Sequence, residues 1–204
     1  LVNTIRRGGA ADAPATPYSF VTALRPAPDG LSGPVPADLD DDEIVINAWL
    51  ADQLAAGVGD TVTLDYSVPG VGEGFVEASR DFRVRAVVPM SALDGEREAM
   101  PRFPGLSDVE SCTGWDIGMP LDKARLSDPA NEAYWREFGE TPKAFVTLPA
   151  GQQMWGNRFG NLMAIRLPAP AGSGAEVENR LTRALDPAQL GLTAMPVRET
   201  ALRA

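Results

Sequence analysis

The chain has 204 residues, a formal net charge of -10 and a hydrophobic fraction of 44%. This length and composition are typical of a folded globular protein with a substantial core, and they argue against a disordered or fibrous chain. Because affinity for nucleic acid depends on clustered Lys and Arg, the acidic balance opposes nucleic acid as a partner.

The scarcity of basic and thiol side chains restricts the chemistry that the chain can perform. The sequence contains no His, which removes Ser-His-Asp and Cys-His catalysis and imidazole zinc sites. Its two lysines, Lys123 and Lys143, do not follow a Ser by three residues, so the S-x-x-K nucleophile is also missing. We therefore predict no catalytic residues, no metal ligands and no cofactor, and we rank a carboxylate enzyme last among the functions considered.

The first 90 residues are expected to form a β-rich lobe with one short helix. Residues 60–68 alternate between apolar and polar side chains, which is typical of a half-buried strand. Residues 48–56 place Trp49, Leu50 and Leu54 on one helical face, and Gly57 is expected to end that helix. The remaining predicted strands share β-branched and aromatic residues between turn signals: 1–7, 17–25, 43–47 and 80–90.

Residues 91–140 are expected to be an irregular insertion. Prolines interrupt every period, and only residues 131–139 are predicted to be helical. A stretch of this length is either functional or packed through its own aromatic side chains. We favour the second interpretation because it contains Trp115, Tyr134, Trp135 and Phe138.

Residues 141–204 are expected to form a second lobe with the order β-α-β-α-β. Its strands are predicted at 143–148, 161–167 and 192–199, and its helices at 149–156 and 174–185. Together the two lobes predict an α+β fold with helices on one face of a mixed sheet.

A run of acids, Asp38 and Asp40 to Glu43, precedes the predicted strand 43–47. An EF-hand loop starting at Asp38 would need Gly and Glu where Glu43 and Trp49 stand, so the template fails. Charge runs are usually solvated. We interpret these acids as the solvated start of a strand, with a weak cation site as the alternative.

Two further features have a functional and a structural interpretation. In "WGNRFGN", Trp155, Arg158 and Phe159 are residue types that anchor interfaces, and they are the candidate partner contact. We favour instead a helix-to-strand corner whose aromatic rings cover the core. Cys112 lies among acids that would raise its pKa, so an inert thiol is favoured over a nucleophile.

The segment "EIVINAWLADQLAAGVGDTVTL" followed by "FRVRAVVPM" resembles the extracytoplasmic core domain of MacB-like and FtsX-like ABC transporter permeases. "KAFVTLPAGQQMWG", "NLMAIRL" and "AEVENRLTRAL" are similar to later segments of that domain in the same order. The resemblance implies a β-rich Sabre-like lobe at 1–90, the insertion at 91–140 and a porter-like lobe at 141–204. The family's first porter half would precede Leu1.

The resemblance implies a non-enzymatic, extracytoplasmic part of a cell-membrane protein that handles substrate or couples mechanically to a partner during export. Its partners would be the membrane helices of its own permease, a cytoplasmic ATP-binding subunit, and an extracytoplasmic protein or lipid-like substrate. The alternative is a free-standing secreted module for ligand binding or adhesion. An apolar segment of about 20 residues after Ala204 would separate the two.

Overall fold

The computed structural model describes residues 2–8, 13–26, 33–70, 74–94, 96, 100–116, 121–158, 160–165 and 173–186. The chain divides into two compact units, Leu1–Ala164 and Ile165–Ala204.

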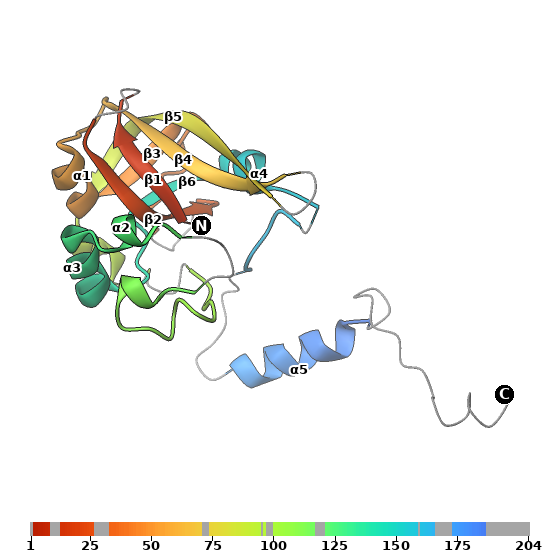
Figure 1. The fold of residues 1–204 in the computed structure, drawn as a ribbon. Coiled ribbons are helices and arrows are strands. Elements are labelled where there is room, and N and C mark those ends of the chain that lie inside the picture. Colours follow the sequence, from red (N-terminus) through yellow and green to blue (C-terminus); the bar gives the residue numbers. More distant parts are fainter. Residues whose placement is uncertain are drawn as a thin grey trace, which may run out of the picture. The chain divides into compact units, whose positions relative to one another are not determined.

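The first unit is built around a closed barrel of six strands (Figure 1). In spatial order the strands are β1, β2, β6, β3, β5 and β4. The β2–β6 and β3–β5 pairs are parallel, and the other pairs are antiparallel. The strand bounds are β1 Val2–Arg7, β2 Ala15–Leu24, β3 Glu43–Asn47, β4 Thr61–Pro69, β5 Phe75–Val88 and β6 Ala144–Thr147.

The barrel core follows from alternating side chains. Val62 and Leu64 of β4 and Phe82 and Val84 of β5 belong to one buried cluster, as the period of two predicts. Strands β3 and β6 are buried at every position. Val45 of β3 and Phe145 of β6 point to the second face. There they form a separate cluster with Val35, Leu39 and Leu93. Both faces are therefore buried, one in the barrel core and the other under Val35, Leu39 and Leu93.

Helices α1 (Ala48–Leu54) and α4 (Leu148–Trp155) close opposite ends of the barrel (Figure 1). Each helix follows its strand directly, because the last strand residue also caps the helix. Asn47 accepts a hydrogen bond from the Leu50 amide, and Thr147 accepts one from the Ala150 amide. The prediction that Gly57 ends α1 is wrong: the helix ends at Leu54, and Ala55 takes the left-handed conformation, with φ 49°.

The insertion is packed through its own aromatic residues, as predicted. Its elements are η1 (Met90–Leu93), η3 (Cys112–Gly114), α2 (Lys123–Leu126) and α3 (Pro129–Phe138). Trp115 and Trp135 are buried with Phe20 of β2, with ring centroids 5.1 to 6.1 Å apart. The Tyr134 and Phe138 rings also lie 5.0 Å apart. The insertion therefore forms a second, aromatic core against the outside of the barrel.

The predicted fold class, α+β with a Sabre-like lobe and a β-α-β-α-β porter-like lobe, is wrong. Strand β6, predicted to begin the second lobe, lies in the barrel between β2 and β3. Of the predicted strand 161–167, residues 161–165 form no strand. Residues 166 and 167 and the predicted strand 192–199 lie outside the described residues. The physical reason is that every residue of β6 is buried. A strand buried on both faces belongs in the interior of a sheet, and the barrel supplies β2 on one edge and β3 on the other.

The second unit contains one described helix, α5 (Gly174–Ala184), close to the predicted range. No residue of α5 is buried, and Leu181 is 55% exposed. No helix in the described part of the chain is long and apolar enough to cross a membrane.

Candidate functional site

The predicted partner contact falls at the end of α4. Trp155 is half-buried and packs edge-on against Tyr66 of β4, with the ring centroids 6.2 Å apart. Arg158 is exposed, and Phe159 lies outside the described residues. The geometry gives Trp155 the packing role that we favoured from the sequence. A partner contact at Trp155, Arg158 and Phe159 stays a prediction.

An apolar groove of about 210 Å³ lies beside Trp155. None of its lining side chains is charged; they are Asn3, Phe20, Tyr66, Ser67, Val68, Pro69, Phe75, Met100, Pro101, Phe103, Leu106, Trp155, Asn157 and Met163. Sites for small molecules are typically lined in this way, by apolar side chains with a few polar groups. Its volume exceeds the roughly 150 Å³ of an engineered apolar cavity that binds benzene.

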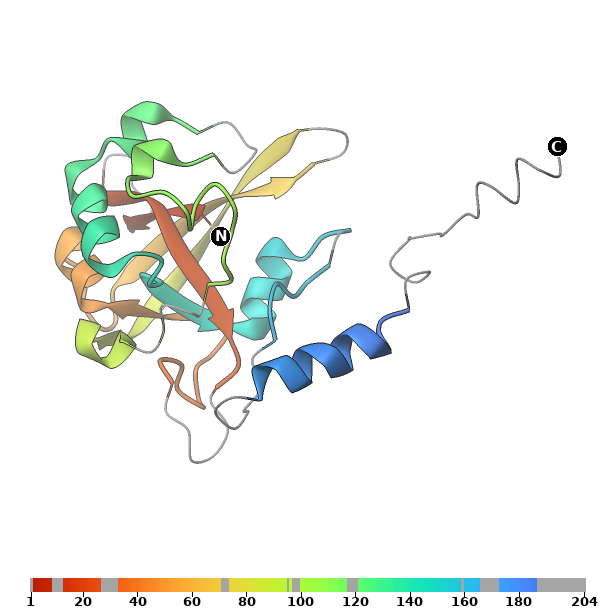
Figure 2. The ribbon, with the colours of Figure 1, turned by 90° about the horizontal axis from the view of Figure 1, so that it is seen from below.

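One wall of the groove is a strand ribbon that extends past the barrel (Figure 2). The register of β1 with β4 ends at Asp65, and the register of β3 with β5 begins at Arg83. The ribbon beyond these residues is two-stranded and runs to the Pro69–Phe75 pair. Phe75 and Val76, on this ribbon, are 51% and 55% exposed.

The rest of the lining comes from β1, β2, α4, the insertion and the chain after α4. Phe103 and Met163, which line these walls, are 43% and 55% exposed. Exposed apolar side chains gathered around one hollow are typical of an interaction site, whereas single ones are ordinary. The groove can therefore bind a neutral, apolar group.

Sequence reasoning found Trp155 and missed the rest of the groove. Phe103 and Met163 lie in segments without a period, and Phe75 follows the Gly-rich stretch 70–74. One feature of the sequence could have indicated the groove. Large apolar residues occur there in stretches rich in Gly and Pro, where no predicted strand or helix would bury them.

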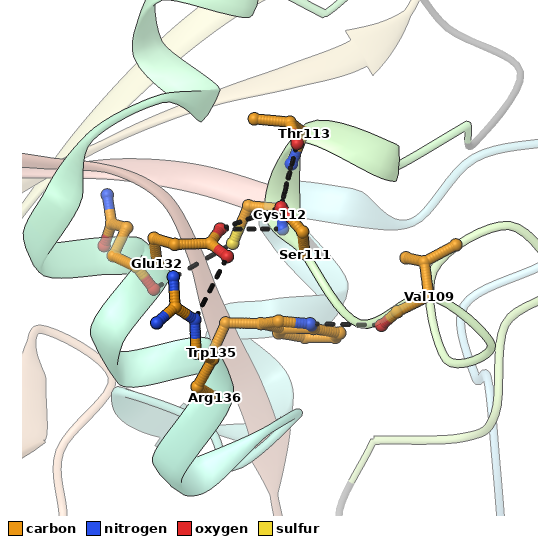
Figure 3. A network of polar contacts seen from close by, with 8 residues as sticks. Val109, Ser111, Cys112, Thr113, Glu132, Trp135 and Arg136 are labelled. Carbon is orange, nitrogen blue, oxygen red and sulfur yellow. Dashed lines mark hydrogen bonds and ion pairs between the residues drawn. The ribbon is translucent and has the colours of Figure 1, made fainter.

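A second candidate is the thiol of Cys112, which η3 holds against α3 (Figure 3). Glu132 accepts hydrogen bonds from the Cys112 amide at 3.0 Å and from the Ser111 hydroxyl at 3.2 Å, and it lies 3.6 Å from Arg136. Burial, followed by the Glu132 carboxylate, raises the pKa of Cys112 to about 12. Because the thiolate is the reactive form, this arrangement favours the inert thiol predicted from the sequence.

Lys143 is a third candidate, because burial lowers its pKa to about 7. A neutral amine can act as a nucleophile on a carbonyl group. However, Lys143 is only 3% exposed, and the cavity that it lines has a volume of about 10 Å³. This cavity has room for about one water molecule and none for an organic substrate.

The acidic run is divided between salt bridges and solvent. Glu43 is buried and pairs with Arg83 and Arg85, so its interpretation as a solvated acid is wrong. Asp38 pairs with Arg85, and Asp41 accepts a hydrogen bond from Thr147. Among the residues that the structure describes, no group of three or more acids or thiols is arranged to hold a metal ion.

Comparison with known proteins does not assign this chain to a family. No protein-family model matches the chain, and no curated protein matches its sequence.

Proposed function

We propose that the chain is an extracytoplasmic domain of an ABC transporter permease of the FtsX/MacB type. In this role it is non-enzymatic and handles substrate, or couples mechanically to a partner, during export. The apolar groove is the part of the barrel unit that contacts the apolar portion of the substrate or partner.

The observation that supports this proposal most is the uncharged groove between the β4–β5 ribbon and the insertion. Its walls come from segments far apart in the sequence, so a relative movement of ribbon and insertion would open or close it. Such movements are how binding is coupled to mechanical work in proteins that do no chemistry themselves. The resemblance of residues 43–64 and 82–90 to segments of the permease family gives the second support.

The alternative is a free-standing secreted module that binds a ligand through the same groove. Both proposals use the groove in the same way, so the groove does not discriminate between them. They differ in whether the chain is attached to a membrane.

Two measurements test the proposal. The gene sequence downstream of Ala204 should encode an apolar segment of about 20 residues, and a stop codon there would favour the secreted module. In the full-length protein, a photo-crosslinking amino acid in place of Phe103 should form an adduct with substrate or partner during ATP-driven export. The same amino acid in place of Val58, which is 69% exposed and does not line the groove, is the matched control. Equal crosslinking at the two positions would remove the groove from the proposal.

A further inference from the structure

The ribbon of β4 and β5 has a free edge along the first half of β5. Strand β5 pairs with β4 from Phe75 to Arg83, but it pairs with β3 only from Arg83 onwards. Between Phe75 and Asp81, the side of β5 that faces away from β4 has no neighbouring strand among the described residues (Figure 2). We call this side of residues 75–81 the β5 edge. It has the place for one more strand.

The register shows which backbone groups point outward from the β5 edge. In an antiparallel ladder, pairs of residues that exchange both hydrogen bonds alternate with pairs that exchange none. The Gly70 amide donates to the Gly74 carbonyl oxygen at 2.8 Å, and the register continues without a break to Arg83. The even-numbered residues of β5 therefore bond to β4, and the odd-numbered ones direct their amide and carbonyl groups away from it. Arg83 confirms this, because its amide donates to the Asp42 carbonyl oxygen on the β3 side.

Four residues thus present outward backbone groups on the β5 edge: Phe75, Glu77, Ser79 and Asp81. All four are exposed, and no residue in the described ranges bonds to these groups. Free edges are normally protected, because they can pair with another chain. Pro69 protects the corresponding edge of β4, since it has no amide hydrogen. The β5 edge contains neither proline nor lysine, so it is open to an added strand.

The side chains of the β5 edge favour a basic segment. Glu77 and Asp81 lie on the same face of the strand, because they are four residues apart. Neither carboxylate lies within ion-pair distance of a basic group in the described chain. Arg80 points to the other face, where it bonds to Gln153 and lies over the Phe82 ring. The face that an added strand would share with Glu77 and Asp81 is therefore acidic.

The acidic run found in the sequence lies where the β5 edge meets β3. The Asp42 carbonyl oxygen accepts its hydrogen bond from the Arg83 amide. The Asp41 carbonyl oxygen accepts one from Nη2 of Arg80. The exposed side chains of Asp40, Asp41 and Asp42 extend the acidic surface beyond the strand. A second copy of the chain, with its net charge of -10, would place acids opposite or diagonal to the same acids, so a basic partner is favoured over self-pairing.

We propose that the β5 edge binds an extended, basic segment of a partner protein, which adds as a strand beside β5. The segment runs antiparallel to β5, because antiparallel pairing is the more stable of the two, and its backbone bonds to the four outward residues. Its Lys or Arg side chains lie opposite Glu77 and Asp81. Apolar side chains of the segment cover Val76 and Ala78 on the other face. This inference does not rest on the proposed transport function.

The test titrates the full 204-residue chain into a fluorescent peptide of seven residues with blocked ends. The peptide carries Lys at the positions that face Glu77 and Asp81, Val at those that face Val76 and Ala78, and Thr elsewhere. Its anisotropy should rise to saturation, and its affinity should fall as salt is added. The same peptide with Glu in place of Lys should bind about ten-fold more weakly. Binding that does not saturate, or equal affinity for the two peptides, would overturn the proposal.

Methylation of the peptide's amides separates strand addition from simple charge attraction. Methyl groups on the amides of the residues that face Glu77, Ser79 and Asp81 should abolish binding, because they remove the donors and block close approach to β5. Methyl groups on the intervening amides, which face away from β5, are the control and should leave the affinity within a few-fold. Equal effects of the two patterns would show that no strand is added. This comparison needs no variant of the protein.

Ser79→Pro tests the edge from the side of the protein. The Ser79 amide faces away from β4, so proline removes the central donor of the β5 edge and leaves the β4–β5 ladder intact. The peptide affinity should fall about ten-fold or more, whereas Ser79→Thr, which keeps the amide, should preserve it. Phe103→Ser should also preserve it, so this proposal and the groove can fail independently. Unchanged binding in Ser79→Pro would contradict the proposal.

Sedimentation of the chain without peptide examines the competing occupant. The parent chain should be monomeric at the concentrations of the titration, because like charges oppose self-pairing. A parent dimer that Ser79→Pro dissociates would assign the β5 edge to a second copy and overturn the proposal. If Ser79→Pro does not fold, the methylated peptides still decide.

Discussion

Glu43 and Arg83 form an ion pair across the parallel strands β3 and β5, where Nη2 of Arg83 donates to Oε1 of Glu43 at 2.6 Å. The Glu43 side chain is buried, while Arg83 is 58% exposed. Arg85 lies on the other side, with its Nε 3.6 Å from Glu43 Oε2. The carboxylate is therefore the member of the pair that most depends on its partners.

Glu43→Gln should lower the free energy of unfolding by about 1 to 2 kcal/mol, because it keeps the volume and removes the charge that two arginines neutralise. Asp42→Asn is the control: Asp42 is exposed, and the change should be within about 0.5 kcal/mol. Urea denaturation measures both. Equal small losses would show that the buried pair adds little.

Stability should rise with pH between about 7 and 9 because of Lys143. Burial lowers the pKa of Lys143 from 10.5 to about 7, so in this range the unfolded chain binds a proton that the folded chain has released. The free energy of unfolding then increases with pH, by at most about 1.4 kcal/mol per pH unit for one proton. Above pH 9 the raised pKa of Cys112 acts in the opposite direction, since the unfolded thiol ionises first.

This pH dependence is measured by urea denaturation at constant ionic strength. The sequence contains no His, which removes the residue type that most often titrates near neutral pH. Lys143→Met should flatten the slope between pH 7 and 9. A parent chain whose stability is constant over that range would contradict the assignment.

Gly151→Ala should destabilise the protein by about 1 to 3 kcal/mol. A Cβ at this position of α4 would lie 2.2 Å from Cβ of Ala23 in β2, so the helix would have to move away from the barrel. This cost exceeds the roughly 1 kcal/mol that Ala gains over Gly in a helix.

Gly57→Ala is the matched control for this packing contact, because no atom lies within 4 Å of a Cβ built there. Its effect on the free energy of unfolding should be small. The contact between α4 and β2 would be looser than the structure shows if the two variants unfolded at the same urea concentration.

The groove should bind a neutral apolar dye such as N-phenyl-1-naphthylamine, with an increase in fluorescence that saturates. Phe103→Ser should weaken binding several-fold, because it removes apolar wall area that the dye would cover. Val58→Ser should leave the affinity unchanged, since Val58 is exposed but does not line the groove. Dye binding that responds equally to both variants would indicate adsorption rather than a site.

The sequence by itself determined most of the local structure. The alternation in residues 60–68 predicted β4, and the apolar run 43–47 predicted β3. The helical face of Trp49, Leu50 and Leu54 predicted α1. These elements are set by side-chain period and by capping residues, which act over a few neighbouring positions.

Only the tertiary structure decided where β6 pairs, and with it the fold class. An apolar strand of four residues fits a small second sheet as well as a barrel, and its two neighbours, β2 and β3, lie far away in the sequence. The burial of Glu43, the burial of the Lys143 ammonium and the groove beside Trp155 depend on the same tertiary arrangement. They depend on contacts between distant segments, and no local pattern contains that information.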